Sequence, residues 1–476
     1  MTTSIKWIAA AALALAHGAW AAPTAAPGFL VRTIPTPDVV QGGVARRGNA
    51  ILVGQGAFGP GGESVVRLDG GNATTIATGF GGLGGFDLAP DGTLYVTDNC
   101  FDGDFGCDDA TTGDTVYAIP DALTRTTPIA AADAEVLPAG SIPFAFDVLH
   151  AGGVLLVTDA VGPGAGRVVE IDGGSTTDIV TGLGYAAGIA LDGSSIVVGD
   201  VDQFFTGSVA RYDLDGAPLG PIAGGLSGVF GIDVDTAGDV LVTGGFTGDF
   251  SSSTLVGIAG GVPAERATGF GFTAGLGYDA PRDAALVLDF GVTEIAAVCR
   301  DANADGLCDA DCAAPAALTS AKVTFGNLLA PGGDDKVVLK GTLAVDGGVT
   351  IDPIASGLTV WADDAGDRVV LDVVVPGGAF DSATRTGWKA NDTLSAWSYK
   401  NPNGVAGITT VKLKRAPASP ETVKVVVKGK KRGTFAAASG ATAPLDVALA
   451  LDTDTCGAVP LPTCLVANEG SVFKCK

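Results

Sequence analysis

Histidine is almost absent, with two residues in 476, and this scarcity limits the chemistry open to the chain. His17 lies in the apolar N-terminal segment, which leaves His150 as the one histidine of the remaining chain. A Ser-His-Asp triad, a histidine dyad or a His-rich metal site would have to be built around His150 alone. Because His150 lies in VLHAGG, between two predicted strands, we interpret it as a turn residue. Catalysis by Asp and Glu side chains stays open.

Apolar runs long enough to cross a bilayer are missing as well. The run from Trp7 to Ala16 is too short to span, and it lies between Lys6 and the small-x-small pattern Ala19 to Ala21. This arrangement is typical of a secretory signal peptide, and the alternative is a buried N-terminal helix. We therefore predict a signal peptide over residues 1–21 and a secreted or periplasmic protein. No cysteine follows the predicted cleavage site, which argues against a lipid anchor.

Helical periodicity is hard to find after residue 21, whereas glycine is abundant, with 72 residues spread along the chain. Such a composition is typical of many short strands joined by tight turns. The charge is uneven: residues 22–314 hold 37 acidic and 10 basic side chains, and residues 315–476 hold 15 and 17. The acidic first part argues against nucleic acid and anionic membranes as partners.

A repeat runs through the first 300 residues. Each copy has a short Gly-flanked apolar strand, a turn, a second strand that ends near Asp, and a third strand. Spacings of 43 to 59 residues are typical of four-stranded propeller blades. The six copies begin at Val40, Gly84, Pro143, Ala186, Val229 and Thr273. We expect Phe29–Ile34 to complete blade six beside 293–298, which would close the ring and remove exposed sheet edges.

The repeats resemble those of the NHL and SMP-30/gluconolactonase group of six-bladed propellers. The segments GIALDGSSIVVGD and FDLAPDGTLYVTDN carry the resemblance, which covers roughly residues 29–298. It implies the fold rather than an activity, because that group includes lactonases, strictosidine-synthase-like proteins and pure binding scaffolds.

The lactonases of that group hold a divalent cation on the propeller axis through Glu, Asn and Asp at the start of the inner strands. None of the matching positions carries such a ligand, and the Glu-Gly-Pro typical of that family is absent. The matching positions are Gly42, Gly84, Phe144, Ala187, Phe230 and Ala274. Phe144 and Phe230 predict an axial entrance that is apolar or plugged. We interpret the recurring strand-end aspartates as caps of turn amides, with a rim of cation ligands as the alternative. They are Asp98, Asp159, Asp200 and Asp289.

Eight cysteines, an even number, predict disulfides in an exported protein. We expect a bridge between Cys100 and Cys107. The others form two groups of three, so full pairing requires at least one bridge between the groups, which would clamp the C-terminus against the linker. These groups are Cys299, Cys308 and Cys312, and Cys456, Cys464 and Cys475.

The linker, residues 299–315, contains the sharpest local motif. Oxygen-bearing side chains alternate as in a calcium loop, with Gly306 at the sharp turn. The loop departs from an EF-hand because Cys312 replaces the bidentate Glu and flanking helices are missing. It resembles thrombospondin type 3 and dockerin loops, which implies that Asp311 replaces that Glu. The predicted ligands of a structural calcium ion are Asp301, Asn303, Asp305, the Leu307 carbonyl, Asp309 and Asp311. The alternative is a solvated, disulfide-pinned linker.

A second acidic loop, residues 98–109, lengthens blade two. Its carboxylates would repel one another without a counter-ion, which makes the loop a second, weaker candidate for calcium. It is also the best candidate for a functional surface on the propeller. The alternative is an exposed, solvated loop. The candidate ligands here are Asp102, Asp104, Asp108 and Asp109.

Residues 316–476 contain about eight strand-like segments separated by Gly, Pro, Asn and Asp, which predicts an antiparallel β-sandwich. We interpret the tryptophans 361, 388 and 397 and Tyr399 as core residues, with a sugar-binding platform as the alternative. The basic stretch 428–432 is interpreted as a hairpin turn kept soluble by charge, although it could contact an anionic partner.

The sequence thus predicts an all-β protein: a six-bladed propeller over residues 22–298, a linker over 299–315 and a sandwich over 316–476. The favoured function is an exported, calcium-stabilised binding or scaffold protein whose ligand is unidentified. One rival is a metal-dependent hydrolase of the lactonase or strictosidine-synthase-like kind. Another is a protein that binds a polysaccharide or cell-surface component through the C-terminal sandwich.

Overall fold

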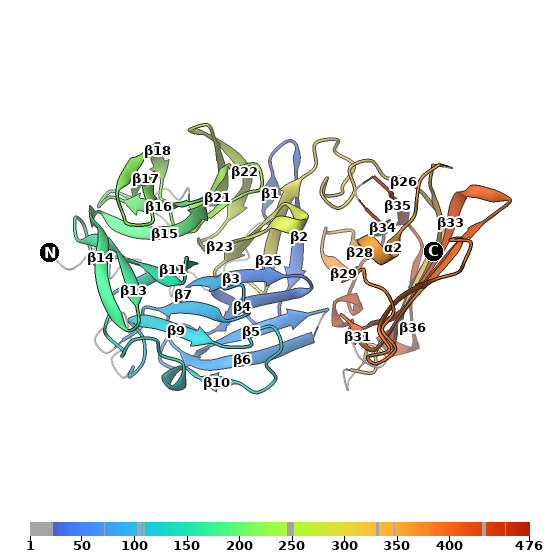
Figure 1. Ribbon diagram of the computed structural model, residues 1–476, viewed down its shortest axis with the longest axis horizontal. Coiled ribbons are helices and arrows are strands. Elements are labelled where there is room, and N and C mark those ends of the chain that lie inside the picture. The colour runs from blue at the N-terminus through green and yellow to red at the C-terminus, as the bar shows by residue number, and fades with distance from the viewer. Residues whose placement is uncertain are drawn as a thin grey trace.

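The chain folds into a propeller and a second β-domain that lie side by side in the computed structural model (Figure 1). Among the described residues there is no helix both long and apolar enough to cross a bilayer. The structure describes residues 22–70, 72–101, 107, 110–244, 252–329, 333–346, 348–430, 435–452 and 454–476.

Six separate sheets form the blades of the propeller, as the repeat predicts. Their inner strands contact one another in sequence around the axis, and β23 meets β3 to complete the ring. The inner strands are β3 (Val40–Arg47), β7 (Leu83–Leu88), β11 (Ala145–Ala151), β15 (Tyr185–Asp192), β19 (Ile232–Val234) and β23 (Thr273–Asp279).

The second strand of each blade is apolar on both faces because neighbouring blades pack face to face. In blade one, Leu52 packs toward blade two, whereas Ile51 and Val53 pack toward blade six. These second strands are β4 (Ala50–Gly56), β8 (Leu94–Asp98), β12 (Val154–Asp159), β16 (Ser195–Val201), β20 (Val240–Gly244) and β24 (Ala284–Asp289).

The outer strands differ among the blades. Among the described residues of blade two the named strands are three. The segment after β9 adds β10 in parallel to blade one and then returns to blade two, where Glu135 forms an antiparallel bridge with Tyr117; this detour contributes to the longest repeat spacing. The short β1 adds to blade five. The outer strands and the two 3-10 helices of this part are β5 (Glu63–Asp69), β6 (Asn72–Phe80), β9 (Thr115–Ile119), β10 (Ile129–Ala130), η1 (Ala131–Asp133), β13 (Gly166–Asp172), β14 (Ser175–Leu183), β17 (Thr206–Asp213), β18 (Pro218–Ser227), β21 (Ser253–Ala259), β22 (Val262–Phe270), β1 (Thr24–Ala25) and η2 (Ala280–Arg282).

The N-terminal strand closes the ring, as predicted. Strand β2 (Phe29–Pro35) pairs antiparallel with β25 (Glu294–Arg300), from Phe29 opposite Arg300 to Pro35 opposite Glu294. Blade six therefore contains both ends of the propeller sequence, and its last strand leads directly into the linker.

The second domain has the two layers of a sandwich, but one continuous curled sheet of twelve strands forms them both. Strand β26 joins the layers, because it pairs antiparallel with β27 and parallel with β35. The elements are β26 (Ala316–Gly326), β27 (Lys336–Ala344), α2 (Pro353–Ser356), β28 (Leu358–Asp364), β29 (Val369–Val375), β30 (Gly387–Ala390), β31 (Ala396–Val405), β32 (Ile408–Ala416), β33 (Ser419–Lys430), η3 (Ala436–Ala438), β34 (Leu445–Ala450), β35 (Cys456–Leu461), β36 (Cys464–Ala467), η4 (Asn468–Gly470) and β37 (Val472–Cys475).

The aromatic residues of this domain are core residues, as interpreted from the sequence. Trp388, Trp397 and Tyr399 are at most 4 % exposed and pack inside the curled sheet. Trp361 is 2 % exposed and packs against Leu307 of the linker. The sugar-platform alternative is therefore wrong, because a stacking platform has to present its rings to solvent.

Candidate functional site

Three aspartates occupy the same position on the inner strands of three blades, in FDL, FDV and IDV. The carboxylate of Asp87 accepts a hydrogen bond from the His150 N–H at 2.6 Å, and that of Asp147 accepts one from the Ile189 N–H at 3.0 Å. Asp233 bonds the backbone of β23 in the same way. Each carboxylate therefore joins its blade to the next one around the axis.

Burial, together with repulsion from the Asp87 carboxylate, raises the pKa of Asp147 to about 8 and that of Asp233 to about 7. The pKa of Asp87 is raised by burial as well. The Asp147 carboxylate lies close to the backbone of blade two, because a Cβ on Gly85 would lie 1.6 Å from Oδ1 of Asp147. Carboxyl groups that titrate near neutral pH can act as acids or bases.

Sequence reasoning missed this set because it examined the wrong positions. The aspartates lie three residues after Gly84, Phe144 and Phe230, which are matching positions at which we sought a cation ligand. The recurrence of Asp after Phe or Ile in three of the six copies was the available signal.

Phenylalanines gather where the inner strands begin. The ring centroids of Phe146 and Phe230 are 6.1 Å apart, those of Phe230 and Phe272 are 5.8 Å apart, and those of Phe272 and Phe290 are 5.3 Å apart. Phe230 is 6 % exposed. The rings gathered on this side are apolar, in line with the apolar entrance predicted from Phe230.

The strand-end aspartates cap amides, as interpreted from the sequence. Asp98 accepts hydrogen bonds from the N–H groups of residues 81, 82 and 100, and Asp289 from those of residues 271 and 272. Asp159 and Asp200 accept from residues 144 and 184 in the same relative position. Their carboxylates are committed to the turns that precede the inner strands, so no rim of cation ligands is needed to explain them.

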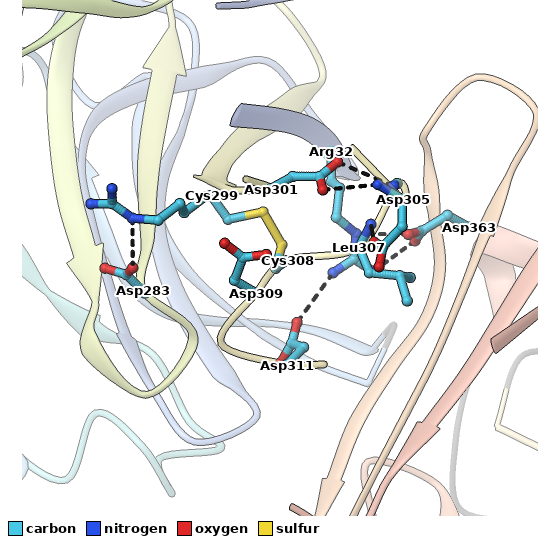
Figure 2. The surroundings of a disulfide bond; sticks show 12 residues. Arg32, Asp283, Cys299, Asp301, Asp305, Leu307, Cys308, Asp309, Asp311 and Asp363 are labelled. Carbon is cyan, nitrogen blue, oxygen red and sulfur yellow. Dashed lines mark hydrogen bonds and ion pairs between the residues drawn. A yellow bond between two sulfur atoms is a disulfide. The ribbon is translucent and has the colours of Figure 1, made fainter. Parts of the chain in front are cut away.

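The linker loop wraps around its own carboxylates (Figure 2). The two carboxylate oxygens of Asp301 accept hydrogen bonds from the N–H groups of Asp305 and Gly306, each at 3.1 Å. Asp305 accepts from the Leu307 N–H at 3.0 Å, and Asp309 accepts from the N–H of residue 302 at 3.1 Å. The disulfide Cys299–Cys308 closes this loop onto the end of β25.

The amide group of Asn303 adds a side-chain contact to the loop, because it donates to Asp305 Oδ2 at 2.8 Å. Hydrogen bonds thus link Asp301, Asn303 and Asp305 within the loop, whereas Asp309 bonds the backbone of residue 302, and the calcium site stays a prediction. The side chain of Leu307 is buried against the second domain, and the ligand role of its carbonyl stays a prediction.

Asp311 lies apart from the other predicted ligands. Its carboxylate faces Arg32, with Oδ2 3.9 Å from Nη1 (Figure 2). Arg32 also forms a two-pronged ion pair with Asp363 of the second domain, in which both contacts are 2.7 Å long. The end of the linker loop therefore joins a charge network between the two domains.

This network contains three arginines of the propeller and is almost closed to solvent. Arg46 contacts Asp372 at 2.8 Å and Arg282 contacts it at 3.0 Å, and both also pair with Asp279. Arg282, Arg46 and Arg32 hold the pKa of the Asp372 carboxyl far below its usual range, although burial opposes them. Burial raises the pKa of Asp311 to about 6, against the attraction of Arg32.

Backbone contacts and a disulfide complete the joint between the domains. Asn49 donates to the Val374 carbonyl at 2.9 Å and accepts from the Val374 N–H at 2.8 Å, as a neighbouring strand would. The Thr33 N–H donates to the Asp367 carbonyl at 2.9 Å. The disulfide Cys312–Cys456 is the predicted bridge between the two cysteine groups, and it ties the linker to β35.

A cavity of about 280 Å³ lies beside this joint. Apolar residues of blades one and six and of β29 form most of its wall, and the side chains of Arg46, Asn49 and Asp372 reach it. Arg46 and Asp372 pair with each other across the joint, and Asn49 bonds the second domain, so the cavity belongs to the interdomain contact.

Within the described ranges, no three His, Cys, Asp or Glu side chains converge closely enough to hold a metal ion. The second candidate set lies outside those ranges, since residues 102–106, 108 and 109 are not described. Of that loop the structure shows its base, where the disulfide Cys100–Cys107 is formed as predicted. The remaining disulfide is Cys464–Cys475.

Two further interpretations need correction. His150 is part of β11 and not of a turn, because the turn begins only at Gly152. Its ring stacks on Tyr95 with centroids 5.5 Å apart. Lys428 and Lys430 belong to strand β33, so the charged stretch continues a sheet, while residues 431–434 lie outside the described residues.

No family model matches the chain, and no curated protein matches it in sequence. Solved propellers share its fold at low identity. A gluconolactonase of Xanthomonas campestris is 12 % identical with a TM-score of 0.43, and the match covers 59 % of this chain and 96 % of that one. Regucalcin, a calcium-binding protein of Agrobacterium tumefaciens, is 15 % identical with a TM-score of 0.36, and the match covers 53 % and 82 %. The pyranose dehydrogenase PQQ domain of Coprinopsis cinerea is 10 % identical with a TM-score of 0.43, and the match covers 59 % and 98 %. These likenesses concern the propeller fold and carry no activity.

Proposed function

We propose that this chain is an exported protein with a binding or scaffold role, and that calcium in the linker loop stabilises the joint between its two domains. The observation that carries the proposal is the loop 301–309. Asn303 donates there to the Asp305 carboxylate and the Asp305 N–H donates to Asp301, between a disulfide and the interdomain charge network. The four disulfides support export, because such bonds persist in oxidising compartments.

Calcium suits this loop because it takes six to eight oxygen ligands in flexible geometry. Hydrogen bonds from loop amides orient the carboxylates of Asp301 and Asp305. The main departure from the predicted ligand set is Asp311, which pairs with Arg32. The ion would therefore draw its ligands from residues 301–309, with water or the carbonyls of the loop completing the shell.

The test is the calcium content of the full chain, measured by mass spectrometry after equilibration with calcium and desalting. We expect about one ion per chain, and its loss in Asp301→Ala/Asp305→Ala. A matched control is Asp213→Ala/Asp215→Ala, which removes two carboxylates from an exposed turn of blade four. A wild-type chain without calcium would contradict the proposal.

Calcium that stays bound to the Asp301→Ala/Asp305→Ala variant would also contradict the assignment of the ion to the linker loop. Asp102→Ala/Asp104→Ala then distinguishes the second acidic loop from the propeller axis as its location.

The rival function, hydrolysis of a lactone or ester, is favoured by one observation: the raised pKa values of Asp147 and Asp233 on the axis. The Asp147 carboxylate has both oxygens occupied by the N–H groups of Val148 and Ile189, which favours the joining role. Lactone hydrolysis that EDTA abolishes and Asp147→Asn removes, with the variant still folded, would make the enzyme the better conclusion.

A further inference from the structure

The outer face of the second domain's larger layer is covered with lysines. Six adjacent strands, β37, β26, β27, β33, β32 and β31, turn apolar residues into the core and the alternate residues outward. Ten of the outward residues are lysines, all of them exposed; we name this surface the lysine face. Its members are Lys322, Lys336, Lys340, Lys400, Lys412, Lys414, Lys424, Lys428, Lys430 and Lys474.

Like charges stand directly opposite one another on this face. The strand register pairs Lys322 with Lys340, Lys336 with Lys430, and Lys414 with Lys424. Such pairs destabilise a sheet. In the described part of the chain every ion pair uses arginine, so no described carboxylate lies within ion-pair distance of these lysines. The concentration of like charge on one face suits an anion outside the chain.

The chemistry of the face narrows the choice of anion. Among the described residues no arginine and no aromatic ring lies between the ten lysines, so the described face offers neither bidentate phosphate contacts nor stacking on nucleic-acid bases; Arg432 lies outside the described residues. The other outward positions are mostly hydroxyl or small apolar residues, such as Thr410 and Val426. Leu465, opposite Lys474 at the margin, is the one large exposed apolar side chain beside them, too little to anchor a membrane.

We propose that the lysine face binds a linear polyanionic polysaccharide that carries carboxylate or sulfate groups along its chain. Neighbouring strands are about 4.8 Å apart, and same-face residues along a strand are about 6.8 Å apart, so the ammonium groups form a grid. An extended polymer can lie across several strands and meet a lysine on each, while neighbouring threonines offer hydroxyl groups to the sugars. The acidic propeller repels the same polymer, which confines binding to this face.

The inference rests on the binding role proposed above, and the calcium loop has no part in it. The experiment measures retention of the full chain on immobilised polygalacturonate, dextran sulfate and neutral dextran. We expect binding to one or both polyanions, none to dextran, and weakening as salt rises. The polygalacturonate and dextran sulfate arms distinguish carboxylate from sulfate recognition.

Lys340→Glu/Lys424→Glu reverses two charges in the centre of the face and should weaken binding at least tenfold, as expected for lost ammonium contacts with a polyanion. The control Arg47→Glu/Arg300→Glu makes the same change in net charge on the propeller and should leave binding unchanged. Thermal unfolding verifies that both variants fold.

Three results would overturn the inference: no retention of the wild-type chain, full retention of the face variant, or tighter binding to duplex DNA or anionic vesicles at equal salt. Calcium content is measured on the same samples. A chain that holds calcium but ignores polyanions contradicts this inference alone, whereas a chain that binds polyanions without calcium contradicts the loop assignment alone.

Discussion

The two domains use their basic residues in opposite ways. All ten basic residues of the propeller part are arginines, and seven of them form ion pairs with aspartates. The other three, Arg47, Arg67 and Arg125, donate to backbone carbonyls. In the second domain most basic residues are lysines, and none of those described pairs with a carboxylate.

This difference shows which charges serve the fold and which face outward. The guanidinium group offers a planar set of donors that suits buried pairs such as Arg32–Asp363, whereas a lysine ammonium stays strongly hydrated at a surface. The propeller's excess of acid is therefore partly used to build joints. The described lysines of the second domain are exposed to solvent.

The largest loss of stability should follow from removing the aspartate that two propeller arginines share at the joint between the domains. Asp372→Ala leaves Arg46 and Arg282 in the interface without their common partner. Removing one member of a buried ion pair costs about 3–5 kcal/mol, so we expect the two domains to unfold separately. The tryptophans of residues 22–476 all lie in the second domain, so their fluorescence follows that domain while calorimetry follows both.

The control for this prediction is Asp392→Ala, which removes an exposed acid of the second domain. It should leave a single transition at the wild-type midpoint. Coincident fluorescence and calorimetric transitions in Asp372→Ala would show that the charge network does not hold the domains together.

The next largest effect compares two disulfides of the second domain. Cys312–Cys456 closes 144 residues and Cys464–Cys475 closes 11, so loop-closure entropy predicts that losing the former costs about 2 kcal/mol more. Paired Cys→Ser variants, unfolded in denaturant and followed by tryptophan fluorescence, check this. Equal losses would mean that strain or residual structure, and not loop length, sets the contribution.

The pH dependence of stability should differ between the propeller and the joint between the domains. Asp147 and Asp233 have raised pKa values, so the stability of their protonated forms is fully present below about pH 4 and is lost as the pH rises through about 7 to 8. Asp372 has the opposite sign, because its pKa is lowered and its contribution is lost only in acid below about pH 4.

We therefore expect the calorimetric transition of the propeller to fall by a few degrees from pH 5 to pH 9, and Asp147→Asn to reduce that fall. The variant keeps an acceptor oxygen for the Ile189 N–H but cannot ionise. An unchanged pH dependence in Asp147→Asn would assign the effect to other buried acids, of which Glu63, with a pKa of about 8, is the first to examine.

The smallest effect concerns the lysine face. Lys424→Glu places an acid opposite Lys414 and should raise the stability of the second domain by about 0.2–1 kcal/mol, as expected when a like-charge pair becomes an opposite-charge pair. Denaturant unfolding measures the gain. Lys389→Glu is a poor substitute for this test, because Lys389 already lies over the Phe380 ring. A loss of stability would show that the lysines are compensated within the fold.

Much of the fold was predictable because it repeats. Six copies of one hydrophobic and turn pattern indicate six blades, and the lone strand at 29–34 indicates how the ring closes. The disulfide clamp between linker and C-terminus followed from counting cysteines. The exception was blade two, whose outer segment first pairs β10 in parallel with the neighbouring blade and then returns to β9, a path that no local pattern predicts.

The blades, the grouping of the cysteines and the alternating acids of the linker could be read from the chain, because each depends on residues close together in it. Packing of the sheets was needed to see that Asp311 joins Arg32 instead of the linker loop, that Asp87, Asp147 and Asp233 connect neighbouring blades, and that ten lysines share one face. Those arrangements depend on partners as distant as Arg32 and Asp363, 331 positions apart, or on strand register, and both are settled only when the sheets pack.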